Sequence, residues 1–66
     1  MKFVVEFNTD NAAFGNDRGD PAWGQEVARI LREVVDKIER DYTIGTIRDL
    51  NGNTVGRFGV QTGEVK

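Results

Sequence analysis

Carboxylates are the side chains through which this sequence could carry out chemistry. Of its 66 residues, 11 are acidic and 9 are basic, and there is no histidine and no cysteine. The commonest general base is therefore missing, together with the commonest ligands of transition metals. A catalytic acid and base would need carboxylates whose pKa an apolar environment shifts, and only Glu6 lies within an apolar run. The sequence predicts that the protein is not an enzyme.

Acidic residues concentrate around the expected start of a helix. They are Asp10, Asp17, Asp20 and Glu26, with Arg18 as the only base among them. A local acidic patch can dock on a basic surface of another protein, where complementary charge speeds association. A second candidate surface is the outer side of the same helix, with Glu33, Asp36 and Glu39. We expect a partner protein to bind one of these two surfaces, and the sequence leaves open which one.

The side-chain oxygens of these acidic residues could instead bind a metal ion. Asp10, Asn11, Asn16, Asp17 and Asp20 supply the ligand type that calcium prefers, but the spacing of a calcium-binding EF-hand loop is absent. Turn formation and helix capping account for the same residues. We expect no metal and no cofactor.

The formal net charge of −2 disfavours direct binding of nucleic acid, which requires a surface that neutralises phosphates. No apolar run approaches the ~20 residues that cross a bilayer, and Glu6 interrupts the place where a signal peptide would continue. The sequence therefore predicts a cytoplasmic protein without direct nucleic-acid or membrane contacts.

One long helix must position most of these acids. The spacing of Val27, Ile30, Leu31, Val34 and Ile38 gathers an apolar stripe on one side of residues 20–40. Asp20 is suited to cap the helix, and Pro21 fits the first helical position. We expect this stripe, with Leu31 at its centre, to be buried.

Three strands are expected to cover that stripe. Residues 2–8 alternate so that Phe3, Val5 and Phe7 share one face, and residues 43–61 form a hairpin. The hairpin turns at residues 49–52, where Gly52 is expected to be left-handed, and a two-residue turn at Asn51 and Gly52 is the alternative. Val55 and Phe58 differ in parity, which predicts a bulge near Gly56. In residues 9–19, Phe14 is expected to tuck under the helix, and residues 61–66 are expected to fray.

The order strand-helix-strand-strand predicts a single α+β domain over residues 1–66. One amphipathic helix packs on a three-stranded antiparallel sheet, which satisfies the burial needs of both layers. The first strand could pair with either hairpin strand. A strand at the edge of the sheet could pair with a second copy of the chain and form a weak dimer. The sequence therefore leaves open whether the protein is a monomer or a weak dimer.

Three segments, residues 7–14, 26–31 and 49–56, resemble a pattern in small proteins encoded by bacteriophages and prophages. The resemblance implies no catalytic residues, and it implies production inside a bacterial host. Anti-CRISPR inhibitors are a recurrent class among such proteins. We therefore expect a phage-encoded inhibitor of a host protein or ribonucleoprotein complex, such as a CRISPR effector, whose nucleic-acid-binding surface it occludes with acidic residues. The alternative is a phage structural component or self-associating interaction module.

Overall fold

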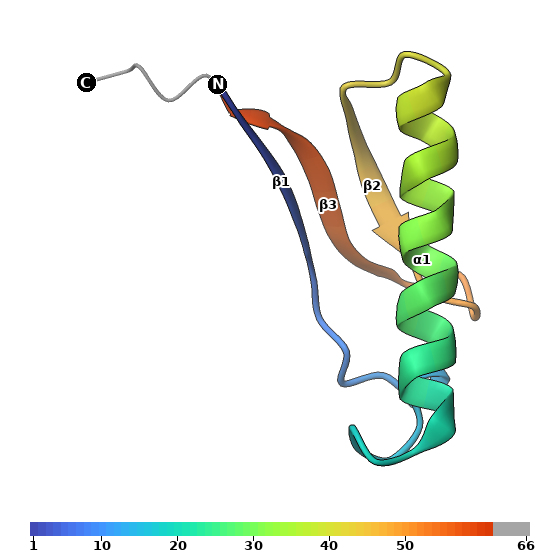
Figure 1. Ribbon diagram of the computed structural model, residues 1–66. Helices are drawn as coiled ribbons and strands as arrows, with labels where there is room; N and C mark the ends of the chain where they lie inside the picture. Colours follow the sequence, from blue (N-terminus) through green and yellow to red (C-terminus); the bar gives the residue numbers. More distant parts are fainter. Residues whose placement is uncertain (62–66) are drawn as a thin grey trace.

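The computed structural model, which describes residues 1–61, shows one helix packed on one face of a three-stranded antiparallel sheet (Figure 1). The elements in chain order are β1 (Lys2–Phe7), the short 3-10 helix η1 (Ala12–Phe14), α1 (Pro21–Glu39), β2 (Ile44–Arg48) and β3 (Thr54–Gln61). This arrangement confirms the expected α+β fold and its strand-helix-strand-strand order. The expectation that residues 61–66 fray lies, beyond residue 61, outside the described residues.

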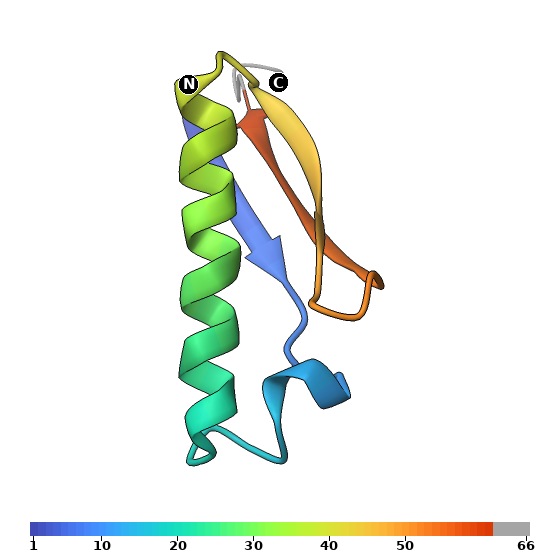
Figure 2. The same ribbon diagram turned by 90° about the vertical axis from the view of Figure 1, so that its right-hand side faces the viewer.

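The sheet has the order β1-β3-β2, so β3, the last of the strands within residues 1–61, is the central one (Figure 2). β1 pairs antiparallel with β3, and Val5 lies opposite Phe58. Side chains of residues opposite each other in a sheet point to the same face. This register therefore places both apolar side chains toward α1, and it settles the pairing that the sequence left open.

The first turn of α1 follows the expected capping pattern. The Asp20 carboxylate accepts a hydrogen bond from the Ala22 amide at 2.9 Å, and Pro21 is the first helical residue. This bond satisfies one of the amides that have no partner within the helix.

The last turn of α1 ends in a left-handed residue that is not glycine. Asp41 has a φ of 72°, and its amide donates to the Ile38 carbonyl at 3.0 Å. The Tyr42 amide donates to the Lys37 carbonyl, also at 3.0 Å. These two bonds form a Schellman motif, which satisfies carbonyls at the helix end. Asp41 thereby turns the chain toward β2.

The core lies between α1 and the sheet. Its buried apolar residues are Phe14, Ile30, Val34, Ile47 and Phe58. They include the predicted Ile30 and Val34 of the helix, the predicted Ile47 and Phe58 of the hairpin, and Phe14, which was expected under the helix.

The buried face of α1 differs from the predicted stripe on one side. Leu31 is 43% exposed and Ile38 is 37% exposed, so the expectation that Leu31 is central to the core is wrong. Glu26, Ile30 and Val34 are the buried helix residues, and their four-residue spacing marks the line that faces the sheet. Compared with the predicted stripe, the buried face of α1 is therefore shifted toward Glu26. Leu31 lies at the far margin of this face, where it is exposed.

The hairpin has the expected turn and the expected bulge. Gly52 has a φ of 87°, and its amide donates to the Asp49 carbonyl at 3.0 Å. Ile47 lies opposite Gly56 but Arg48 lies opposite Thr54, which leaves Val55 as the extra residue of a bulge. Because of this bulge, Val55 and Phe58 both contact the core despite their opposite parity.

Candidate functional site

The acids predicted to bind a partner fall into three places in the structure. Asp10, Asp17 and Asp20 lie in the loop between β1 and α1, Glu26 lies beneath the hairpin turn, and Glu33, Asp36 and Glu39 lie on the outer side of α1. Asp10, Asp17, Glu33, Asp36 and Glu39 are exposed, Asp20 is half-buried, and Glu26 is buried. The fold therefore does not gather the predicted residues into one site.

The loop between β1 and α1 is anchored to the core. Phe14 is fully buried, and its ring stacks on that of Phe7 with 6.2 Å between ring centroids. The Phe14 amide donates to the Asn11 carbonyl at 3.0 Å, which closes the turn of η1. The Asn11 side-chain amide donates to the Asp49 carboxylate at 2.7 Å. The loop is consequently fixed both to the core and to the hairpin.

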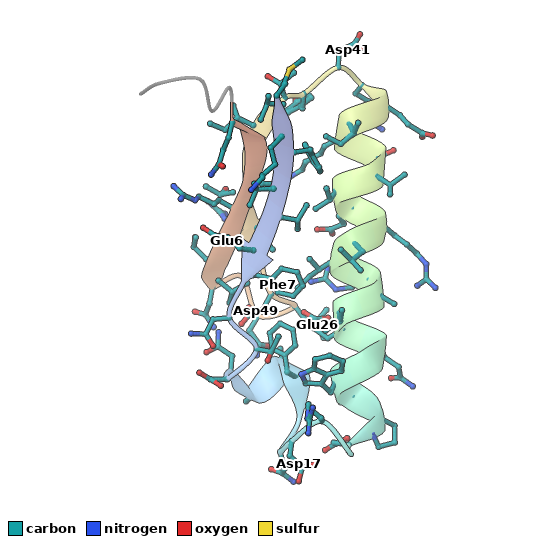
Figure 3. The ribbon with its side chains drawn as sticks, turned by 60° about the vertical axis from the view of Figure 1, so that its left-hand side comes forward. Glu6, Phe7, Asp17, Glu26, Asp41 and Asp49 are labelled. Atoms are coloured by element: carbon teal, nitrogen blue, oxygen red, sulfur yellow. The ribbon has the colours of Figure 1, made fainter. Side chains whose placement is uncertain are left out.

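Two loop acids are tied to backbone amides. Asp20 accepts bonds from the amides of Ala22 and, at 3.2 Å, Asn16, and these bonds lower the pKa of its carboxyl. Asp17 accepts a bond from the Gly19 amide at 2.8 Å and remains exposed. Figure 3 shows Asp17 at the end of the molecule, beside the start of α1. Asp20 is therefore a structural residue, whereas Asp17 also presents charge to solvent.

Glu26 is not at the surface, which corrects its placement in an exposed acidic patch. Its side chain is 5% exposed and accepts bonds from Arg29 at 2.8 and 2.9 Å and from the Leu50 amide at 2.7 Å. The bond from Arg29 is the main reason that the pKa of Glu26 is lowered, and the Leu50 amide adds to the effect against the opposing influence of burial. Glu26 fastens α1 to the hairpin turn.

Asp49 is a second buried carboxylate, which sequence reasoning identified only as a turn residue. It is 4% exposed, and its oxygens accept bonds from the amides of Asn51 and Asn53 at 2.9 Å and from the Asn11 side chain. Burial opposes ionisation, but bonds led by that from Asn11 outweigh it and lower the pKa of Asp49. Figure 3 shows Glu26 and Asp49 near each other where the helix, loop and hairpin meet.

These two carboxylates hold structure together and are poorly suited to proton transfer. Both pKa values are lowered, so both groups are ionised at neutral pH. Every buried polar side-chain atom in residues 1–61 has a hydrogen-bond partner, so the oxygens of Glu26 and Asp49 are already engaged. A general base needs a lone pair that faces its substrate.

The outer side of α1 carries acids interleaved with bases. Arg29 pairs with Glu33 at 2.8 Å, and Arg40 pairs with Asp36 at 3.3 Å, as the four-residue spacing predicts. Arg32 and Asp36 have the same spacing, as do Glu33 and Lys37, but neither pair is among the ion pairs of residues 1–61. This face therefore presents mixed charge, in contrast to the loop.

The sheet face that points away from α1 has a shallow hollow of about 820 Å³. Its charged side chains are Glu6 and Arg57, which pair with each other at 3.0 Å.

Within residues 1–61, no three acidic side chains converge in a way that could hold a metal ion. In the same part of the chain, neither helix combines the length and apolar character that crossing a membrane requires.

Comparisons of the chain with protein-family models, with curated proteins and with solved structures find no match.

The buried Glu26 predicts a specific dependence of stability on pH. Its pKa is lowered in the folded state from an ordinary value of 4.5, so it stabilises the fold above that value and loses this contribution as pH falls through and below it. Glu26→Gln should lower the free energy of unfolding by about 1–3 kcal/mol at neutral pH. Urea unfolding between about pH 7 and about pH 3 should show the deficit shrinking in acid. A deficit independent of pH would contradict this role.

Proposed function

We propose that the protein is a small, non-enzymatic, phage-encoded inhibitor of the anti-CRISPR kind, which binds a host protein complex in the bacterial cytoplasm. The observation that supports it is the anchored loop between β1 and α1, which keeps Asp10 and Asp17 exposed, with Asp17 at the end of the molecule beside the start of α1. Phe14 fixes this loop from below, and Asp20 fixes it at the helix start. The loop therefore presents its charge from a preorganised backbone, which reduces the entropy that binding removes.

The proposed mechanism is occlusion of a nucleic-acid-binding surface. Such a surface carries Lys and Arg side chains placed to neutralise phosphates. Carboxylates of a second protein compete for the same cations, and complementary charge raises the association rate most at low salt. Asp10 and Asp17 take this role, and Arg18 is the only basic residue close to them in the sequence.

The experiment compares two charge-neutralising variants. Asp10→Asn with Asp17→Asn removes two loop charges, and the amide oxygen of an asparagine can still accept the bond from the Gly19 amide, so the fold is preserved. The matched variant Asp36→Asn with Glu39→Gln removes two charges from the outer face of α1. We expect the loop variant to slow binding to the host complex and to weaken phage protection, and the helix variant to change both much less.

The readouts are phage protection in a panel of CRISPR subtypes and pull-down from host lysate followed by association kinetics. A loss of binding only in the helix variant would move the site to Glu33, Asp36 and Glu39. Absence of protection against every subtype would contradict the inhibitory role. Equal melting temperatures of the three proteins would show that the comparison concerns binding and not folding.

A further inference from the structure

Within residues 1–61, no strand pairs with the outer edge of β1, which leaves backbone groups there for another strand. β1 is at one end of the sheet, and the Asn8 amide donates to the Val55 carbonyl at 2.9 Å. In an antiparallel pair, backbone groups point alternately toward the neighbouring strand and away from it. The amides and carbonyls of Phe3, Val5 and Phe7 therefore point to the open edge of the sheet.

An exposed apolar surface adjoins this edge. α1 packs across the sheet and contacts β2. Phe3, on the helix-facing side of β1, is 47% exposed. Arg29 contacts the Arg48 carbonyl of β2, and Leu31 is two residues further, about 200° around the helix axis. Leu31 consequently lies on the flank of α1 toward β1.

Further helix residues extend this apolar flank. Val35 is 55% exposed and Ile38 is 37% exposed, and they follow Leu31 at helical spacing. Leu31, Val35 and Ile38, together with Phe3, form what we call the β1-side apolar surface. An open strand edge beside an apolar surface is a site at which proteins associate.

The other edge of the sheet is less accessible. At β2, the guanidinium of Arg29 donates to the Arg48 carbonyl at 3.2 Å, so α1 caps one end of that strand. In addition, two β2 strands that paired antiparallel could not form opposite-charge pairs, because Arg48 is the only charged residue of β2. These two features favour β1 as the edge that binds.

We propose that a second copy of this chain pairs with β1, antiparallel and centred on Val4. In this register Lys2 of each copy lies opposite Glu6 of the other, so the strand is complementary in charge to itself. Phe3 lies opposite Val5 of the second copy, and the outward backbone groups of both residues form reciprocal hydrogen bonds. A register centred on Val5 would instead place Lys2 opposite Asn8 and leave Glu6 opposite Val4.

The resulting dimer has a continuous six-stranded sheet with both helices on one face. The two β1 strands become central, and Phe3 of each copy joins the apolar side chains of the other. Two-fold symmetry makes the same patch serve both copies. The dimer does not depend on the proposed inhibitory function, because it uses neither the loop acids nor the outer face of α1.

The test reverses the charges of Lys2 and Glu6, which this register places opposite each other. The wild-type chain should show concentration-dependent dimerisation in sedimentation equilibrium. Lys2→Glu places two acids opposite each other, and Glu6→Lys places two bases opposite each other, so each variant alone should dimerise roughly tenfold more weakly. Mixed in equal amounts, the two variants restore opposite-charge pairing, and they should form a heterodimer more tightly than either variant pairs with itself.

Controls separate this pairing from general effects of charge and folding. Arg48→Glu makes the same charge change as Lys2→Glu on the other edge strand and should leave dimerisation unchanged. Glu6→Lys also loses the pair with Arg57, so its folding is checked by circular dichroism before mixing. If Glu6→Lys does not fold, Lys2→Glu alone remains decisive, because unchanged dimerisation would exclude the register. A wild-type chain that stays monomeric in the millimolar range, or variants that gain nothing on mixing, would overturn the proposal.

Discussion

Ile30→Ala should lower the free energy of unfolding by about 2–5 kcal/mol, because it deletes most of a side chain that is 1% exposed at the centre of the core. A domain of this size has only about 3–10 kcal/mol of stability, so the variant is close to unfolding. Urea unfolding followed by circular dichroism measures the loss.

The neighbouring residue provides the matched control. Leu31→Ala removes the same kind of side chain from a position that is 43% exposed, and it should cost about 1 kcal/mol or less. Both variants are measured at low concentration, where dimerisation does not contribute. Equal losses for Ile30→Ala and Leu31→Ala would show that α1 presents a different face to the sheet.

Gly56→Ala should destabilise the protein by about 1–3 kcal/mol or more, because the sheet leaves no room for a methyl group there. A Cβ atom at Gly56 would meet the backbone carbonyl oxygen of Glu6 and the Cα atom of Phe7, both on β1. These backbone atoms can yield only if β1 moves away from β3. A melting curve of the variant tests the expectation.

Gly24→Ala is the control variant, for which we expect a gain in stability instead of a loss. Gly24 lies in α1, and a Cβ atom there would meet no atom within 4 Å. Alanine has the higher helix propensity, so this variant should gain up to about 1 kcal/mol. A stabilised Gly24→Ala beside an unaffected Gly56→Ala would show that β1 and β3 lie farther apart than described.

The features that could be predicted from the sequence follow from local rules. The Asp20 cap, the left-handed Gly52 and the bulge at Val55 each depend on a few adjacent residues. Phe14 was also placed correctly, because it is the only large apolar side chain in its loop. The fold class then follows, since one apolar stripe and three short strands have few ways to cover each other.

The features that could not be predicted depend on contacts between distant residues. Glu26 is buried because it accepts the amide of Leu50, which lies 24 residues further along the chain. Burial of this charge turns the helix and leaves Leu31 exposed. A signal was available, since Glu26, Ile30 and Val34 share a four-residue spacing, but periodicity alone assigns glutamate to the solvent side.

For the candidate binding acids, too, the sequence did not predict the contacts between distant residues that decide which acids are exposed. Residue type predicted that carboxylates would crowd the helix start, yet Asp20 and Glu26 are used within the fold while Asp10 and Asp17 are exposed. Asp49 was recognised as a turn residue, and its bond from Asn11 joins segments 38 residues apart. Which acids remain available to a partner is therefore decided by tertiary structure.

The central position of β3 has a consequence for how the chain folds as it is made. Of the three described strands β1 is synthesised first, but its partner β3 is synthesised only after both β1 and β2. Until then, neither β1 nor β2 has a neighbour in the sheet, whereas α1 needs only local hydrogen bonds. Closing so long a loop is slow and costs chain entropy. A nascent chain stalled before Thr54 should hold at most a helix, and the sheet should form in one late step.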